Sequence, residues 1–320
     1  MVAGPFGVLT LVSSNLESFF TYYAFFFSAA LACEVLNQWV GRWKYPHPDE
    51  RIVVERFELR VGPAVTLVGD LVFPPPERAA RLAPEGRSPV AVLLHGYDSS
   101  RGQLDFLKVP LLLRGFAVLA YDQRGHGDST GDRNDFLYIM RDLERVLDAL
   151  SRDRRLDAGR IVVAGVSMGA GVALTEGYRD GRVRHVVALA AWSDYRTMVA
   201  EGIRPLSKKW WIRKRYALRG LNVDPSLLQS NLVSPAFFVG QRKGFFGVPV
   251  PWDVDDRDRV LLLHCADDYV VERENFDENV GAFGLGPDNA TLFEQGGHAF
   301  YKQEASVVAV VSRWLGERGL

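Results

Sequence analysis

A serine between two glycines marks the segment best suited to nucleophilic chemistry. Residues 165–169 read Gly-Val-Ser-Met-Gly; an apolar run typical of a buried strand precedes them, and small residues that suit a helix start follow. Such a turn strains the backbone of Ser167, and a Cβ atom at Gly165 or Gly169 would clash with neighbouring chain. The turn exposes the Ser167 hydroxyl at a helix N-terminus, where N–H groups favour a developing negative charge. The pattern therefore predicts a serine nucleophile.

A serine hydroxyl needs a general base, and the chain holds six histidines. His298 lies in Gly-Gly-His-Ala-Phe, between the last predicted strand and the last predicted helix, and its glycines let the backbone bring the ring close to Ser167. His264 ends a strand, which favours a packed core position, whereas His185 starts a strand among charged neighbours and is expected to be exposed. The remaining three lie in a linker or in loops: His47, His95 and His126. We predict His298 as the base.

A third group must orient the imidazole and stabilise its protonated form. The predicted strand 260–264 is followed by two consecutive aspartates, Asp267 and Asp268. One is expected to face His298 and the other to cap the next turn. The residues alone leave open which does which.

The elements that must position these residues alternate between strand and helix. Short, continuously apolar runs are typical of parallel strands buried on both faces, and two β-rich runs separated by Val-Gly-Pro predict an antiparallel pair. The expected class is α/β, with about eight mostly parallel strands and helices on both faces of the sheet. The predicted strands are 52–59, 65–73, 90–94, 116–121, 161–166, 186–190, 260–264 and 291–294, and the clearest helices are 103–114, 135–151 and 306–315.

One long segment breaks this alternation. An insertion of about 70 residues between two core strands predicts a cap over the site, residues 193–258, between core parts 45–192 and 259–320. Within it, Arg204–Gly220 carries seven basic residues, no acidic one, and the pair Trp210-Trp211. Two interpretations stay open: a solvated cap surface, or a patch that meets anionic lipid headgroups with its tryptophans at the interface.

The N-terminal segment, residues 1–44, is hydrophobic and predicted to be helical. Glu17 is the one charged side chain among residues 1–33, but the uncharged run 18–33 is shorter than the roughly 20 residues that span a bilayer. The segment can dock on the rest of the chain, anchor it in a membrane through residues 1–40, or form an oligomer contact. No positive residue precedes the run, while Arg42 and Lys44 follow it, which favours a cytoplasmic location or the cytoplasmic face of a membrane.

Composition excludes several other classes of protein. The net charge of -1 provides no global basic field for a nucleic acid. Cys33 and Cys265 are too few for a disulfide framework or a Cys-rich zinc site, and both are expected to be reduced. No clustered ligand set and no Gly-rich Walker motif occur, so neither a metal nor a cofactor is expected. The expected partner is a small-molecule acyl substrate; the oligomeric state stays open.

From about residue 52 to the C-terminus, the chain resembles the α/β-hydrolase superfamily. His95-Gly96-Tyr97-Asp98 resembles the loop after the third strand, residues 122–129 (Asp-Gln-Arg-Gly-His-Gly-Asp-Ser) the loop after the fourth, and the Ser167 turn and the Asp and His loops complete the order. The resemblance implies that Asp268 is the acid, by alignment with the family pattern G-x-x-D-x-x-V. Cys265 departs from the Gly of that pattern, which keeps Asp267 as the alternative.

The resemblance also implies an oxyanion hole formed by the backbone N–H groups of Tyr97 and Met168. Four polar residues of the matching loops are interpreted as holding those loops beside the site: His95, Asp122, Arg124 and His126. Two more, Asp128 and Ser129, are expected to cap the following turn.

The predicted function is a serine hydrolase that cleaves carboxylic esters, with acylglycerol-like esters favoured by the aromatic cap. A serine peptidase of the aminopeptidase or oligopeptidase type is the alternative; an acidic cluster in the cap would favour it, whereas Arg204–Gly220 is basic. A non-catalytic, membrane-associated binding protein would not need the three residues together. A dehalogenase of this fold would need a carboxylate at the position of Ser167.

Overall fold

The computed structural model describes residues 52–83, 86–196, 208–222, 234–236 and 259–320, together with Ser28 and Val239. The chain divides into two compact units, Met1–Glu50 and Arg51–Leu320. The predicted N-terminal helix lies, apart from Ser28, outside the described residues. In the part of the chain that is described, no helix has the length and apolar character needed to cross a membrane.

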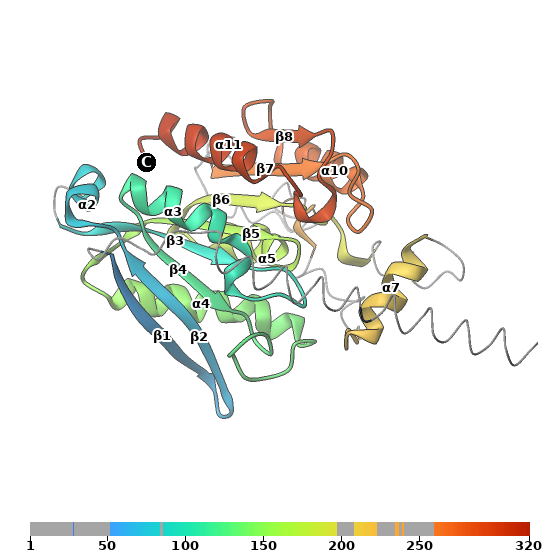
Figure 1. Ribbon diagram of the computed structural model, residues 1–320, viewed down its shortest axis with the longest axis horizontal. Helices are drawn as coiled ribbons and strands as arrows, with labels where there is room; N and C mark the ends of the chain where they lie inside the picture. The colour runs from blue at the N-terminus through green and yellow to red at the C-terminus, as the bar shows by residue number, and fades with distance from the viewer. Residues whose placement is uncertain are drawn as a thin grey trace, which may run out of the picture. The chain divides into compact units, whose positions relative to one another are not determined.

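The described strands form one eight-stranded sheet in the order β1-β2-β4-β3-β5-β6-β7-β8 (Figure 1). β1 pairs with β2, and β2 with β4, in antiparallel fashion; every other neighbouring pair is parallel. The α/β class and the mostly parallel sheet are therefore confirmed. The strands are β1 (Val53–Gly62), β2 (Val65–Phe73), β3 (Ser88–Leu94), β4 (Ala117–Asp122), β5 (Leu156–Val166), β6 (Val183–Leu189), β7 (Val260–Cys265) and β8 (Ala290–Phe293).

Helices cover both faces of this sheet, as the apolar runs require. Successive strand side chains point to opposite faces, so Val90, Val92 and Leu94 of β3 enter one core while Ala91 and Leu93 enter the other. The first core is closed by α4 (Phe136–Arg152), α5 (Met168–Val172), the π-helical turn η2 (Ala173–Gly177) and α10 (Arg273–Phe283); the second by α3 (Asp105–Arg114) and α11 (Glu304–Glu317). Further short elements are α2 (Pro76–Leu82), η1 (Arg101–Leu104), η5 (Gly297–Ala299) and the separate helix α7 (Lys208–Leu218).

The apolar stripe predicted on α4 is the buried face of that helix. All seven of its apolar members are buried against the sheet: Phe136, Ile139, Met140, Leu143, Val146, Leu147 and Leu150. Asp142 is buried among them, and its carboxylate receives two hydrogen bonds from Arg124, at 2.8 and 2.7 Å. This pair supplies the partner that a buried charge needs, and it ties the loop after β4 to α4.

Parallel strands bring their carboxyl ends to one edge of the sheet, which is where ligands bind in open α/β folds. The loops that follow β3, β4, β5, β7 and β8 carry the residues of the predicted active site. The fold thus gathers segments that are far apart in sequence at one edge.

Candidate active site

The turn that carries Ser167 has the strained geometry that the sequence predicts. Ser167 joins β5 to α5 with φ 52° and ψ -114°, a conformation that side-chain-bearing residues rarely adopt. The Ser167 N–H donates to the Leu189 carbonyl at 2.9 Å, which fixes the turn against β6. A Cβ atom on Gly165 would lie 2.2 Å from the Gly169 carbonyl oxygen, and one on Gly169 would lie 2.2 Å from the Leu94 carbonyl oxygen. Both glycines are therefore sterically required.

Ser167, His298 and Asp268 form a continuous hydrogen-bonded chain. His298 Nε2 lies 2.9 Å from Ser167 Oγ, and His298 Nδ1 lies 2.8 Å from Asp268 Oδ2. The Asp268 side chain is fully buried, and its other oxygen accepts the N–H groups of Val270 and Val271 at 2.8 and 3.0 Å. Fixed on three sides, the carboxylate can hold the imidazole with Nδ1 as the donor and Nε2 facing the hydroxyl.

The neighbouring Asp267 has a different task. Its carboxylate accepts the N–H groups of Gly297 at 2.7 Å and Gly296 at 3.2 Å, the two residues before His298. These bonds, that from Gly297 foremost, lower the pKa of Asp267. Gly296 and Gly297 have positive φ, 139° and 58° respectively. Asp267 thus anchors the turn from which His298 projects, and of the two candidates it is Asp268 that contacts the ring.

The loop after β3 is held beside Ser167 by His95 and Gln103. His95 is buried, with Nδ1 2.7 Å from the Gly96 carbonyl and Nε2 accepting the Gln123 N–H at 2.9 Å. Burial lowers the pKa of His95 to about 4, so the ring is neutral at ordinary pH. The Gly96 N–H donates to Gln103 Oε1 at 2.7 Å, and a Cβ atom on Gly96 would lie 3.3 Å from the Ser167 Cβ. The next residue is Tyr97, whose N–H the resemblance assigns to an oxyanion hole; that role stays a prediction.

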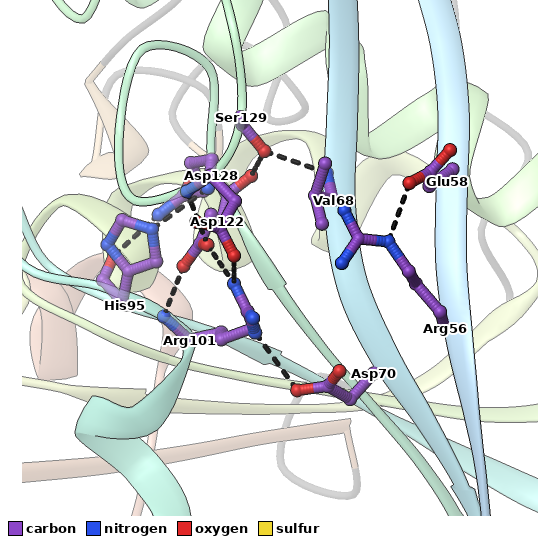
Figure 2. Close-up of polar contacts among 10 residues, drawn as sticks. Arg56, Glu58, Val68, Asp70, His95, Arg101, Asp122, Asp128 and Ser129 are labelled. Atoms are coloured by element: carbon purple, nitrogen blue, oxygen red, sulfur yellow. Dashed lines mark hydrogen bonds and ion pairs between the residues drawn. The ribbon is translucent and has the colours of Figure 1, made fainter.

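The loop after β4 is held by ion pairs and hydrogen bonds, several of which Figure 2 shows. Asp122 is fully buried, forms an ion pair with the Arg101 guanidinium, and accepts the N–H groups of Arg101 and Asp128 at 2.6 and 2.9 Å. Arg101 also reaches Asp70 of β2 at 2.9 Å. These contacts agree with the predicted loop-holding roles, as do the Arg124 pair with Asp142 and the His126 Nδ1 contact with the Arg124 carbonyl at 2.9 Å.

Two residues of that loop differ from the turn-capping prediction. The Ser129 hydroxyl donates to the Asp122 carbonyl at 2.6 Å and accepts the Val68 N–H at 2.8 Å, so it joins the loop to β2 (Figure 2). Asp128 pairs with Arg101 at 2.9 Å. The partners of Ser129 lie on β2 and β4 and the partner of Asp128 lies on η1, so both side chains are directed away from the next turn.

The remaining described histidines are packed inside the protein. His264 is buried, as predicted, and its Nε2 lies 2.9 Å from the Val271 carbonyl. The prediction that His185 is exposed is wrong, since only 6% of the residue is accessible and its ring lies edge-on to Trp314 at 5.2 Å. The charged neighbour Arg184 points to the opposite side of β6. Cys265 is a buried free thiol whose pKa burial raises to about 12.

Within the predicted cap, residues 208–222 make contacts with the loops around the site. Asn134, just before α4, accepts the Tyr97 hydroxyl at 3.1 Å and the Asn222 N–H at 3.0 Å, and its amide donates to the Gly220 carbonyl at 3.1 Å. Arg133 and Arg219 both reach the Asp98 carboxylate, at 3.3 and 3.5 Å. Sequence reasoning missed Asn134 and Gln103, because their partners lie on other segments and follow no local spacing. In the described residues, no group of three or more His, Cys, Asp or Glu side chains is placed to hold a metal ion.

Comparison with known proteins agrees with the fold described above. A family model described as serine aminopeptidase, S33 (Hydrolase_4) matches residues 87–236. The esterase Pf2001 of Pyrococcus furiosus aligns with a TM-score of 0.58 at 19% identity, over 86% of this chain and 96% of that one. A putative lipase of Acinetobacter baumannii aligns with a TM-score of 0.55 at 16% identity, over 82% and 91%. The fold of the chain is therefore that of the α/β-hydrolases, and residues 87–236 match the model of a family of such hydrolases.

A curated relative shares part of the sequence. Hydrolase LUC6 of a Fusarium species is 29% identical over 210 residues, which make up 63% of this chain and 48% of that protein. The chain thus spans about half the length of the curated relatives that it matches.

Proposed function

We propose that the chain is a serine hydrolase that cleaves carboxylic esters through an acyl-enzyme intermediate. The observation that carries this proposal is the hydrogen-bonded chain from Ser167 Oγ through His298 to Asp268, at 2.9 and 2.8 Å, on a turn with positive φ at the serine. A hydroxyl within hydrogen-bonding reach of an imidazole that a buried carboxylate orients is the arrangement that activates a serine. We assign Ser167 as nucleophile, His298 as base and Asp268 as its orienting acid.

The steps follow from this geometry. As Ser167 Oγ bonds to the ester carbonyl carbon, His298 Nε2 takes the hydroxyl proton and the carbonyl oxygen becomes negative. The carbonyl then re-forms, the bond to the leaving alkoxide breaks, and His298 returns the proton to that oxygen, so an alcohol leaves. A water molecule, deprotonated by His298, repeats the sequence on the acyl-enzyme and releases the acid. Asp268 stabilises the imidazolium in both halves.

The developing oxyanion needs donors that are already in place. Met168 is the first residue of α5, so its N–H has no acceptor within that helix. Tyr97 is the residue after Gly96, and Gly96 packs against Ser167, so the Tyr97 N–H belongs to a segment beside the nucleophile. We assign these two N–H groups to the oxyanion hole. Each donor in such a hole contributes about 3 kcal/mol to transition-state stabilisation.

Lipid-like acyl esters are our preferred substrates. Apolar and aromatic side chains flank the segments that carry the site: Trp211 and Leu218 on α7 are exposed, and Tyr269 directly follows Asp268. Such surfaces suit an acyl chain better than a charged peptide. The resemblance to proteins described as an esterase and a putative lipase points the same way.

An aminopeptidase activity is the second candidate, because the matching family model bears that description. A peptidase of this kind needs carboxylates to bind the substrate's N-terminal ammonium group, whereas all seven charged residues of Arg204–Gly220 are basic. A panel of short- and long-chain esters, run beside aminoacyl amides, separates the two candidates by kcat/KM.

The decisive experiment is intact mass after incubation with a fluorophosphonate. An activated Ser167 displaces fluoride and gains one phosphonyl group, and neither Ser167→Ala nor His298→Ala gains one at a comparable rate. In the ester panel, Ser167→Ala is expected to lower kcat by about 10⁶-fold. Absence of an adduct on the folded wild-type chain, with detergent present to keep the site accessible, overturns the proposal in favour of a non-catalytic binding protein.

A further inference from the structure

One face of α7 combines exposed apolar groups with positive charge. Trp211, Lys214, Arg215 and Leu218 follow the spacing i, i+3, i+4 and i+7, which places them on one side of the helix. All four are exposed, and the accessible fractions of Trp211 and Leu218 reach 61% and 89%. Single exposed apolar residues are ordinary, but here an indole and a leucine bracket two cations. We call these four residues the Trp211 face.

The positive charge around this face is local. Arg204–Gly220 contributes seven basic residues and no acidic one, although the whole chain has a net charge of -1. The electrostatic field of these basic residues falls off over a Debye length, about 10 Å at 0.1 M salt. A partner surface that is attracted to these basic residues must therefore be negatively charged and must approach within about that distance. A second copy of the chain would oppose like charges at this face, which argues against self-association there.

The Trp211 face adjoins the proposed active site. The Arg215 guanidinium lies 3.5 Å from the Tyr269 hydroxyl and 5.9 Å from the centre of its ring, and Tyr269 directly follows Asp268. On the His298 loop, Tyr301 is 69% exposed. In Figure 1, α7 lies on the side toward which the arrows of β6 and β7 point. Exposed aromatic and basic groups thus continue from α7 onto the loops that carry Asp268 and His298.

We propose that the Trp211 face docks the protein on an anionic lipid bilayer. Indole rings favour the membrane–water interface, and Lys and Arg side chains favour anionic headgroups. Trp211 and Leu218 enter the headgroup region, while Lys214 and Arg215 contact lipid phosphates. The arrangement turns the loops of the proposed active site toward the lipid surface. The docking itself does not depend on hydrolysis.

Vesicle flotation with the full chain tests the docking. Wild type is compared on vesicles of phosphatidylcholine alone and of phosphatidylcholine mixed with phosphatidylglycerol, at low and high salt. We expect binding to the mixed vesicles only, weakening as salt rises. Each cation at an anionic surface is worth about fivefold in partitioning, so Lys214→Glu/Arg215→Glu is expected to lower binding by at least about 20-fold. Trp211→Ala lowers it several-fold at both salt concentrations.

The matched control is Arg141→Glu/Arg145→Glu, which changes the net charge equally on two exposed residues of α4. It is expected to bind nearly as wild type, and circular dichroism checks that every variant is folded. Three results overturn the proposal: no binding of wild type to the anionic vesicles at low salt, equal binding by Lys214→Glu/Arg215→Glu, or equal loss in the α4 control. A heparin-binding assay run in parallel distinguishes a lipid surface from other polyanions. Binding to heparin without binding to vesicles would indicate a site for another polyanion, and would also overturn the proposal.

Discussion

Asp267 and Asp268 are consecutive residues that hold two different parts of one loop. Asp268 lies 2.8 Å from Nδ1 of the His298 ring, whereas Asp267 accepts the backbone N–H groups of Gly297 and Gly296. The first orients the side chain and the second fixes the main chain from which it projects. Two adjacent carboxylates thus divide the positioning of a single imidazole.

Substitution of each aspartate by asparagine is expected to separate these tasks. Asp268→Asn favours the wrong tautomer of His298 and lowers kcat by about 10⁴-fold with little change in KM. Asp267→Asn keeps an acceptor but loses the charge, and the less well-fixed loop lowers kcat by between about tenfold and about a hundredfold. Steady-state kinetics on a soluble ester measures both.

The control for this pair is Asp277→Asn, on an exposed carboxylate of α10 that pairs with Arg273 at 3.4 Å. It should leave kcat within about twofold of wild type, because exposed pairs contribute little. Equal effects at positions 267 and 268 would contradict the division of roles.

Asn134 is expected to control how firmly residues 208–222 hold to the loops of the site. Asn134→Asp keeps the acceptor for Tyr97 and Asn222 but loses the donor to the Gly220 carbonyl, whereas Asn134→Ala loses all three bonds. A lost hydrogen bond of about 1 kcal/mol raises the population of the open state roughly fivefold. Limited trypsin digestion within the basic helix α7 should therefore accelerate in both variants, and more in Asn134→Ala.

Tyr97→Phe is the matched control, because it removes the bond between the Tyr97 hydroxyl and Asn134 but leaves the two bonds that join Asn134 to residues 220 and 222. It should leave trypsin cleavage of α7 near the wild-type rate. Cleavage that is unchanged in Asn134→Ala would show that this asparagine does not secure the segment.

Glycine substitutions at the Ser167 turn should be far more damaging than one on a helix surface. A Cβ atom on Gly169 would lie 2.2 Å from the Leu94 carbonyl oxygen, whereas one on Gly281 in α10 meets nothing within 4 Å. Gly169→Ala is expected to lower the free energy of unfolding by at least about 2 kcal/mol. Gly281→Ala should raise it by about 0.5–1 kcal/mol through helix propensity. Thermal unfolding of both variants checks the contrast, and a stable Gly169→Ala chain would mean that the turn can open.

The sequence predicts those features whose physical cause is local. Apolar runs mark the strands, and the two glycines around Ser167 mark the tight turn, because strand burial and steric clash act within a few residues. Asn134 and Gln103 are different: each is one polar residue whose partners lie on segments brought near only by the folded sheet. His185 shows a further limit of prediction from sequence. Charged neighbours along a strand do not indicate whether a residue on the opposite face of that strand is buried.

Acid should destabilise the fold through its buried neutral histidines, His95 above all. Burial lowers the pKa of His95 from 6.5 to about 4, so between these values the unfolded chain binds a proton that the folded chain does not. Stability then rises with pH across this window. Above about pH 6.5 the His95 proton has no effect, and as pH falls to about 4 the free energy of unfolding decreases by about 3 kcal/mol. Burial also lowers the pKa of His126 and His264, which adds to the same trend.

His95→Gln isolates the contribution of this one residue. Glutamine can still accept the Gln123 N–H but cannot titrate. At neutral pH the variant's free energy of unfolding should therefore be about 1 kcal/mol below that of wild type. On acidification, the variant's free energy of unfolding should then decrease less than that of wild type. Urea unfolding at a series of pH values measures both, and an unchanged m-value shows that the same transition is compared. One proton accounts for at most about 1.4 kcal/mol per pH unit. Between about pH 6 and 4.5, the slope of the free energy of unfolding against pH should therefore be smaller in the variant than in wild type by nearly that amount. An identical slope in the two chains would place the acid sensitivity elsewhere, with His126 and His264 the next residues to substitute.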